Sequence, residues 1–82
     1  MEIIIPDMGH GNCVGIFVKD ASFLVDCGAQ NKKKALNLRF IQSSLNNSST
    51  KDLAITHYHY DHYNLLKKFP DKFFDNIYKF RK

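Results

Sequence analysis

Four side chains that can bind metal ions fall within six consecutive positions of this 82-residue chain. They are His57, His59, Asp61 and His62, and they form an H-x-H-x-D-H pattern. Two histidines at positions i and i+2 point the same way only where the backbone is extended. His59 and His62 are three positions apart, so they cannot share that strand face. The pattern therefore predicts a β-strand end that turns directly into a loop, with side chains converging from two directions.

The donor types in this cluster indicate a site for divalent metal ions. Neutral imidazole nitrogens and carboxylate oxygens are ligands that suit zinc and similar ions. Four donors from one segment exceed the three protein ligands of a single catalytic zinc, which favours two ions that share a bridging hydroxide. The alternative is a polar loop whose histidines are satisfied by hydrogen bonds.

Hydrophobic periodicity and turn residues predict a sheet with covering helices. Strands are expected over residues 2–5, 14–18, 22–25, 53–55 and 75–80, with a hairpin turn over 19–21. A helix that begins with Asn31 as its cap is expected to run to about Leu45. A second, short helix is expected to begin at Asp61 or Asn64 and to end at Lys68.

The longer helix carries two rows of apolar side chains. One row lies on a single face at helical spacing and comprises Ala35, Leu38, Ile41 and Leu45. Leu36 and Phe40 lie nearly opposite this row. Because a helix that covers one sheet face needs only one apolar stripe, the second row predicts a further surface to bury, from a partner or from additional chain.

The strand that precedes the histidine cluster is wholly apolar. Leu53-Ala54-Ile55 is typical of a strand buried on both faces in a parallel or mixed sheet. It delivers the cluster at its C-terminal end, where ligand sites gather in layered α/β folds. The expected fold class is therefore α/β (α+β), with a mixed sheet.

Charge is distributed unevenly along the chain. The formal net charge is +4, because residues 1–31 are acidic on balance whereas residues 32–82 are strongly basic. A basic second half favours phosphate-bearing substrates, including nucleic acid. The alternative is a lysine-rich, solvated surface. Lys32–Lys34, Lys67 and Lys68 lack interleaved aromatic residues, which speaks against a base-stacking platform for nucleic acid.

Cysteine content and hydropathy predict a soluble, cytoplasmic protein without a membrane association. The two cysteines, Cys13 and Cys27, are too few for a disulfide framework and are expected to be buried, reduced thiols, although a single Cys13–Cys27 bridge stays open. No signal-like segment is visible at the start of the chain, and no apolar run approaches the roughly 20 residues that span a bilayer.

The cluster and three further segments resemble the metallo-β-lactamase fold superfamily of binuclear metal hydrolases. The H-x-H-x-D-H pattern is the specific element of this resemblance. Asp7-Met8-Gly9-His10-Gly11-Asn12 is similar to a glycine-containing loop of several branches, and Phe23-Leu24-Val25-Asp26-Cys27-Gly28 is similar to the strand–Asp–x–Gly element. The apolar strand at residues 53–56 leads into the pattern, and the order and spacing match across residues 1–80.

The resemblance implies a role for each site residue. His57 and His59 would bind a first metal ion, and Asp61 and His62 a second; the ions would be two zinc ions, with manganese or iron as alternatives. Asp61 would also be catalytic, because it could orient or deprotonate the attacking water. Asp26 would support the ligand loop, or simply cap a turn. His10 would lie near the mouth of the site, or be an ordinary loop histidine.

The resemblance also implies an incomplete domain. A full domain of this superfamily is a four-layer αββα sandwich, and residues 1–82 would form a single partial domain that corresponds to its N-terminal half. The superfamily draws later ligands from downstream, whereas no histidine follows His62 here. A second chain, a C-terminal half or a homodimer would then complete a hydrolase in which metal-bound hydroxide attacks an ester or phosphodiester bond, with a nuclease-type activity favoured. The alternative is a non-catalytic metal-binding or interaction subunit of a larger assembly.

Overall fold

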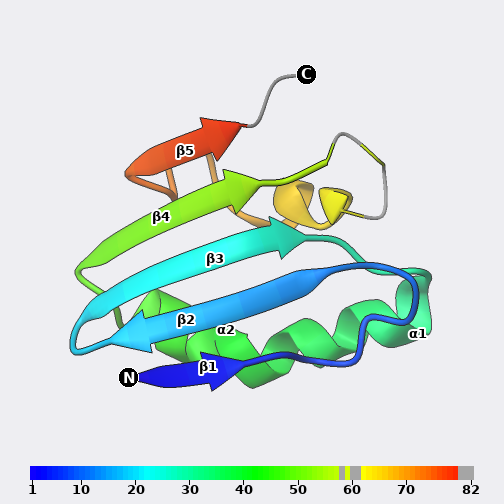
Figure 1. Cartoon of the computed structure of the whole chain (residues 1–82), viewed down its shortest axis with the longest axis horizontal. Coiled ribbons are helices and arrows are strands. Elements are labelled where there is room, and N and C mark those ends of the chain that lie inside the picture. The colour runs from blue at the N-terminus through cyan, green and yellow to red at the C-terminus, as the bar shows by residue number, and fades with distance from the viewer. Residues whose placement is uncertain (58, 60–61, 80–82) are drawn as a thin grey trace.

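A five-stranded mixed sheet organises the chain in the computed structural model, which describes residues 1–57, 59 and 62–79 (Figure 1). The strands are β1 (Glu2–Ile4), β2 (Cys13–Val18), β3 (Ala21–Cys27), β4 (Thr50–Ile55) and β5 (Asn76–Lys79), in that spatial order. The first three strands pair antiparallel, and β3, β4 and β5 pair parallel. The predicted α+β fold with a mixed sheet is therefore confirmed.

The helical layer between β3 and β4 has three consecutive parts. They are α1 (Lys32–Ala35), the 3-10 turn η1 (Leu36–Leu38) and α2 (Arg39–Asn46). Asn31 caps α1 as predicted, since its side chain accepts a hydrogen bond from the Lys34 N–H at 2.9 Å. The predicted single helix is interrupted where Lys34 and Asn37 are both bonded to Asp7 in the loop before β2.

One face of the sheet packs on this helical layer and forms the core. The predicted helix row is buried in full and comprises Ala35, Leu38, Ile41 and Leu45. These side chains lie in one cluster with Leu24 and Leu53, the buried centres of β3 and β4. The second row is exposed, with Leu36 62% and Phe40 57% accessible to solvent, and the further surface expected to bury it stays a prediction.

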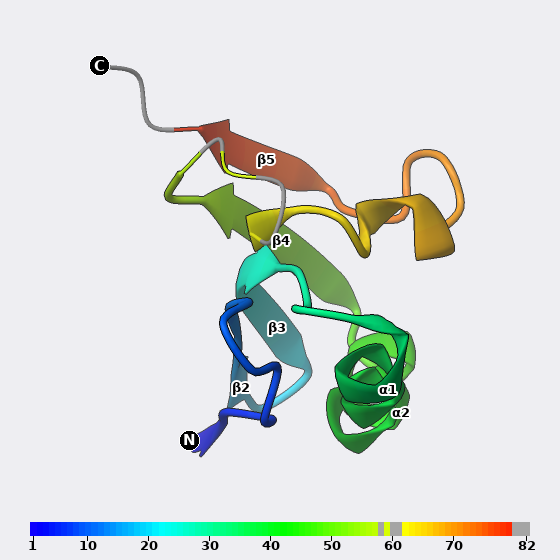
Figure 2. The ribbon, with the colours of Figure 1, turned by 90° about the vertical axis from the view of Figure 1, so that its right-hand side faces the viewer.

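The opposite face of the sheet is also apolar. Register places Val14, Ile16 and Val18 of β2 opposite Val25, Phe23 and Ala21 of β3, with their side chains on this second face. The ring of Phe23 stacks on that of Tyr78 in β5 at 6.3 Å between centroids. Figure 2 shows that α1, α2 and the segment before β5 all lie on the other side of the sheet. Ile3, Val18 and Tyr78 are each about half exposed, so the described residues leave this face uncovered.

The short helix predicted after the histidine cluster is much reduced. Within the described residues of this segment, His62 has a 3-10 conformation and Leu66–Lys68 form the 3-10 turn η3, but no α-helix is present. Asn64 does not cap a helix because its side chain bonds Ala29, accepting from the Ala29 N–H at 2.8 Å and donating to the Ala29 carbonyl at 2.7 Å. Asp61, the other predicted start, lies outside the described residues.

The five predicted strands are all present, with small shifts in their ends. β3 extends to Cys27 and β4 begins at Thr50, so both are longer than predicted. Residues 53–55 are buried, as expected for an interior strand. No helix in the described part of the chain is long and apolar enough to cross a membrane.

Candidate metal centre

The histidine cluster lies at the edge of the sheet where the parallel strands β3 and β4 end. β4 ends at Ile55, and His57 follows two residues later. Asp26 is the penultimate residue of the neighbouring strand β3. Because β3 and β4 run in the same direction, their carboxyl ends bring Asp26 and the cluster together.

Asp26 is the hub of this edge. Its side chain is fully buried, at 0% exposure, and its backbone has φ +60°, a left-handed conformation that aspartate tolerates better than most residues. Oδ1 accepts from the Thr56 N–H at 2.7 Å, and Oδ2 accepts from the Thr56 hydroxyl at 2.6 Å. Oδ2 also accepts from Asn12 Nδ2 at 2.7 Å and lies 3.0 Å from His62 Nδ1. One carboxylate thus joins the loop before β2, the end of β4 and the His62 turn.

Burial and hydrogen bonding act in opposite directions on the Asp26 carboxyl. Burial alone would raise its pKa, but the hydrogen bonds from Thr56, His62 and Asn12 outweigh burial and hold the pKa below its usual value. Asp26 is therefore ionised near neutral pH. A carboxylate on Nδ1 fixes the orientation of the His62 ring and directs its other nitrogen, Nε2, towards any metal ligation.

Three imidazole rings converge beyond β4. The ring centroids are 5.0 Å apart for His57 and His62, 5.9 Å for His57 and His59, and 6.1 Å for His59 and His62. The His62 N–H donates to the His59 carbonyl at 2.9 Å, which closes the turn. Thr56 Oγ1 lies 3.0 Å from His57 Nδ1, so Thr56 contacts both Asp26 and a cluster histidine.

The convergence of the rings suits metal binding, although the described residues do not complete a metal site. With Zn–N distances of about 2.0–2.1 Å, two imidazoles on one tetrahedral ion have centroids roughly 5 Å apart. The three histidine rings approach this separation, and imidazole is a preferred zinc ligand. No group of three His, Cys, Asp or Glu side chains among the described residues is arranged to hold a metal ion. Asp61, the predicted fourth ligand and catalytic residue, lies outside them, so the ligand assignments stay predictions.

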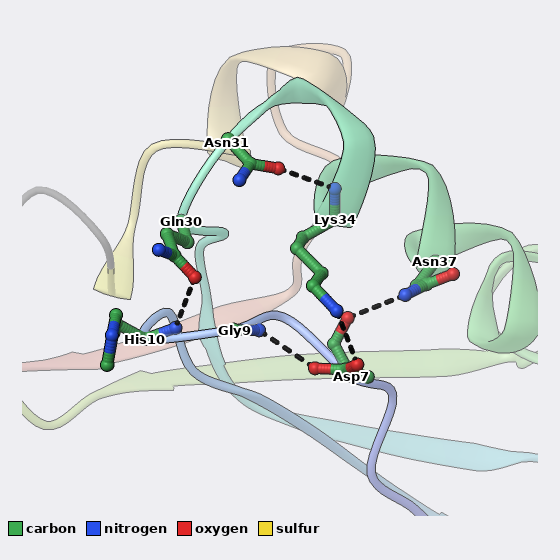
Figure 3. Close-up of polar contacts among 7 residues, drawn as sticks. All are labelled: Asp7, Gly9, His10, Gln30, Asn31, Lys34 and Asn37. Atoms are coloured by element: carbon green, nitrogen blue, oxygen red, sulfur yellow. Dashed lines mark hydrogen bonds and ion pairs between the residues drawn. The ribbon is translucent and has the colours of Figure 1, made fainter.

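His10 lies on the loop before β2, which is tied to the start of the helical layer (Figure 3). Its backbone N–H donates to Gln30 Oε1 at 3.2 Å, while its ring is turned away from these contacts and is exposed. Asp7 anchors the same loop through an ion pair with Lys34 at 2.6 Å. Within the described residues the His10 ring makes no contact with the cluster histidines, and its place at the site mouth stays a prediction.

Gly11 lets this loop approach the end of β3. A Cβ atom at Gly11 would lie 2.5 Å from Ala29 Cα and from the Gly28 carbonyl oxygen, which is far too close for any other residue. The close contact places Asn12 beside Asp26, and the Gly28 N–H donates to the Asn12 carbonyl at 3.0 Å. The glycine-containing loop thus delivers a hydrogen-bond donor to the carboxylate hub.

Three residues support the site although the sequence patterns assigned them no role there: Asn12, Thr56 and Asn64. Asn12 and Thr56 both bond Asp26, and Asn64 fixes the segment after His62 to Ala29. Asn12 ends the glycine-containing loop and Thr56 directly precedes the cluster, so their positions in the sequence indicated that they lie near the site. The position of Asn64 did not indicate its role, because its hydrogen-bond partner lies 35 residues away.

Cys13 and Cys27 are buried, free thiols on the neighbouring strands β2 and β3, next to the hydrogen-bond network of Asp26. They are direct partners in the β2–β3 register and flank Asn12 and Asp26 in the chain. Two effects raise the pKa of the Cys27 thiol far above its ordinary value: the larger is the hydrogen bond with Cys13, and the second is burial. The thiolate is the reactive form, so the raised pKa makes Cys27 unreactive in the folded chain. Burial shields both thiols from reagents in solvent, since Cys13 is 1% and Cys27 0% exposed.

We expect iodoacetamide to label neither cysteine in the native chain at neutral pH, and to label both after unfolding in urea. Mass spectrometry of the intact protein counts the added groups directly. A Cys27→Ser variant serves as the control for assigning Cys13. Rapid labelling of the native chain would show that the thiol pair is accessible, contrary to its burial.

The comparison with protein families agrees with this geometry. The family model of the metallo-beta-lactamase superfamily matches residues 6–82. The chain therefore belongs to the metallo-beta-lactamase superfamily, which is in general a family of hydrolases. No curated protein and no solved structure gave a significant match. The resemblance expected from the sequence is thus confirmed at the level of the superfamily.

Proposed function

We propose that the chain is the metal-binding part of a metal-dependent hydrolase that cleaves an ester or phosphodiester bond. The observation that carries this proposal is the convergence of three histidine rings beside a buried, ionised Asp26. The alternative, a non-catalytic metal-binding or interaction subunit, uses the same residues without turnover. The two functions differ in whether the completed site hydrolyses a substrate.

The proposed roles follow the superfamily pattern. His57 and His59 would hold one ion, and Asp61 and His62 a second, with zinc first and manganese or iron as alternatives. Bound divalent ions lower the pKa of water and so supply hydroxide near neutral pH. Asp26 keeps the His62 ring oriented through Nδ1, and Asp61 is proposed to position the attacking water or to accept its proton.

A second structural layer is proposed to complete this enzyme. The uncovered sheet face carries Ile16, Phe23 and Val25, and no described residue packs over it. An apolar sheet face in water favours association with another apolar surface. A C-terminal half, a partner chain or a second copy would bury this face and supply further ligands.

Metal analysis tests the proposed function. We expect the chain, dialysed against zinc and then against chelator-free buffer, to retain zinc that a His57→Ala/His59→Ala double variant does not retain. Removal of each ligand should weaken metal binding at least about tenfold. A Glu2→Gln variant, at the exposed end of β1, is the control.

The stoichiometry separates the two candidate functions. Two ions per completed site favour catalysis, whereas one ion closed by four protein ligands favours a structural role. Failure of the wild-type chain to retain any zinc, manganese or iron would contradict both.

A further inference from the structure

Two adjoining hollows form a furrow on the helical side of the molecule. Each has a volume of about 590 Å³, and they share Ala35, Leu36 and Lys68. One hollow extends along α2 to Asn47, and the other extends to Asn64 and Lys67 in the segment after the histidine cluster. The furrow thus runs between the helical layer and η3, which lie on the same side of the sheet in Figure 2.

The described charged side chains that line the furrow are all cationic. Among the described residues, its charged side chains are Lys32, Arg39, Lys67 and Lys68, and no described aspartate or glutamate lines either hollow. Within the described part of the chain none of these four forms an ion pair. Lys34 differs, because its charge is compensated by Asp7 at 2.6 Å. The fold therefore gathers uncompensated positive charge in one furrow from two segments that are far apart in the sequence.

One side of the furrow is formed by residues 64–68, the segment that directly follows His62. Asn64 lines the furrow and is fixed to Ala29 by two hydrogen bonds of 2.8 and 2.7 Å. The Leu65 N–H donates to the Cys27 carbonyl at 2.9 Å, next to Asp26. A ligand in the furrow would therefore contact a segment that is held firmly against the end of β3.

We propose that this furrow binds the phosphodiester backbone of a nucleic-acid strand. The proposal rests on the proposed function, because it names the substrate class of the same hydrolase. Several cations spread over two adjoining hollows suit a polyanion better than a single small anion. No aromatic side chain lines the furrow in the part of the chain that the structure describes, so binding is through phosphates, independent of sequence and strongly dependent on salt.

Fluorescence anisotropy with a labelled single-stranded oligonucleotide tests this proposal. The titrations are done in EDTA, so that metal binding plays no part. We expect wild-type binding to weaken at least tenfold in a Lys67→Glu/Lys68→Glu variant. The slope of log affinity against log salt should become shallower by about 0.7 for each phosphate group that the variant no longer neutralises.

The matched control is Lys72→Glu/Lys79→Glu, which makes the same change of charge at two lysines outside the furrow, both exposed. It should bind within about threefold of wild type. A Lys67→Gln/Lys68→Gln variant should weaken binding to an intermediate extent. Circular dichroism and urea unfolding confirm that each variant is folded.

Equal weakening in the furrow and control variants would overturn the proposal, since net charge alone would then explain binding. Absence of wild-type binding at low salt would overturn it as well. Loss of zinc in the His57→Ala/His59→Ala variant with oligonucleotide binding retained would support the furrow as an element separate from the metal centre. Zinc retention by the wild-type chain without oligonucleotide binding would refute the furrow proposal and leave the metal-centre proposal intact.

Discussion

Replacement of Asp26 by alanine is expected to lower the free energy of unfolding by about 3–5 kcal/mol. The alanine would leave the Thr56 N–H, the Thr56 hydroxyl and Asn12 Nδ2 without their buried acceptor. It would also remove the partner of His62 Nδ1. Because small domains have only about 5–15 kcal/mol of stability, this decrease is a large fraction of the total.

Urea denaturation followed by circular dichroism measures the effect of Asp26→Ala. Asp71→Ala is the matched control, since Asp71 is exposed and its removal should change stability by no more than about 0.5 kcal/mol. A decrease below about 1 kcal/mol for Asp26→Ala would show that water replaces the carboxylate. The hub would then be a weaker structural element than its hydrogen bonds indicate.

The same carboxylate makes stability depend on pH. The pKa of Asp26 is lower in the folded chain than in the unfolded chain, so the unfolded state binds more protons in acid. The contribution of the Asp26 carboxylate to the free energy of unfolding is complete above a pH of about 3.9, the ordinary pKa of aspartate. This contribution is lost as the pH falls through the lower pKa of the folded state. Asp26→Asn, which cannot titrate, should therefore flatten the acid limb of the stability curve.

Replacement of His59 by alanine is expected to reduce metal-dependent turnover by on the order of 100-fold or more. The measurement uses the chain together with the proposed second layer, and a phosphodiester substrate. Turnover should require added zinc or manganese and should disappear with chelator. The His59 side chain is exposed, so the variant should fold normally.

Glu2→Gln provides the control for this activity, because Glu2 lies on the edge strand β1. It should leave turnover unchanged. An unaltered rate in His59→Ala would exclude His59 from the metal centre. Zinc binding without any turnover in the wild-type assembly would favour the non-catalytic alternative.

Local patterns account for the parts of the fold that could be predicted. The buried row at Ala35, Leu38, Ile41 and Leu45 followed from helical spacing, and the interior strand at 53–55 from an unbroken apolar run. In both cases the spacing of apolar residues along the sequence indicates which side chains of the helix or strand are buried. The cluster position at the end of β4 followed from the same strand.

Tertiary contacts account for what could not be predicted. The break in the helix coincides with contacts from Lys34 and Asn37 to Asp7, about 30 residues away. Asn64 looked like a helix cap but binds Ala29 instead. The cationic furrow depends on the packing of η3 beside the helical layer, and no pairwise spacing in the sequence encodes that.

The uncovered sheet face also bears on how the chain behaves after synthesis. A surface carrying Ile3, Val18, Phe23 and Tyr78 attracts other nascent chains as readily as the proposed second layer, particularly next to the exposed edge strand β5. The chain should therefore require a chaperone or prompt co-assembly to stay dispersed at high concentration. Co-expression with the proposed second layer should raise the recovered yield more than any change of buffer.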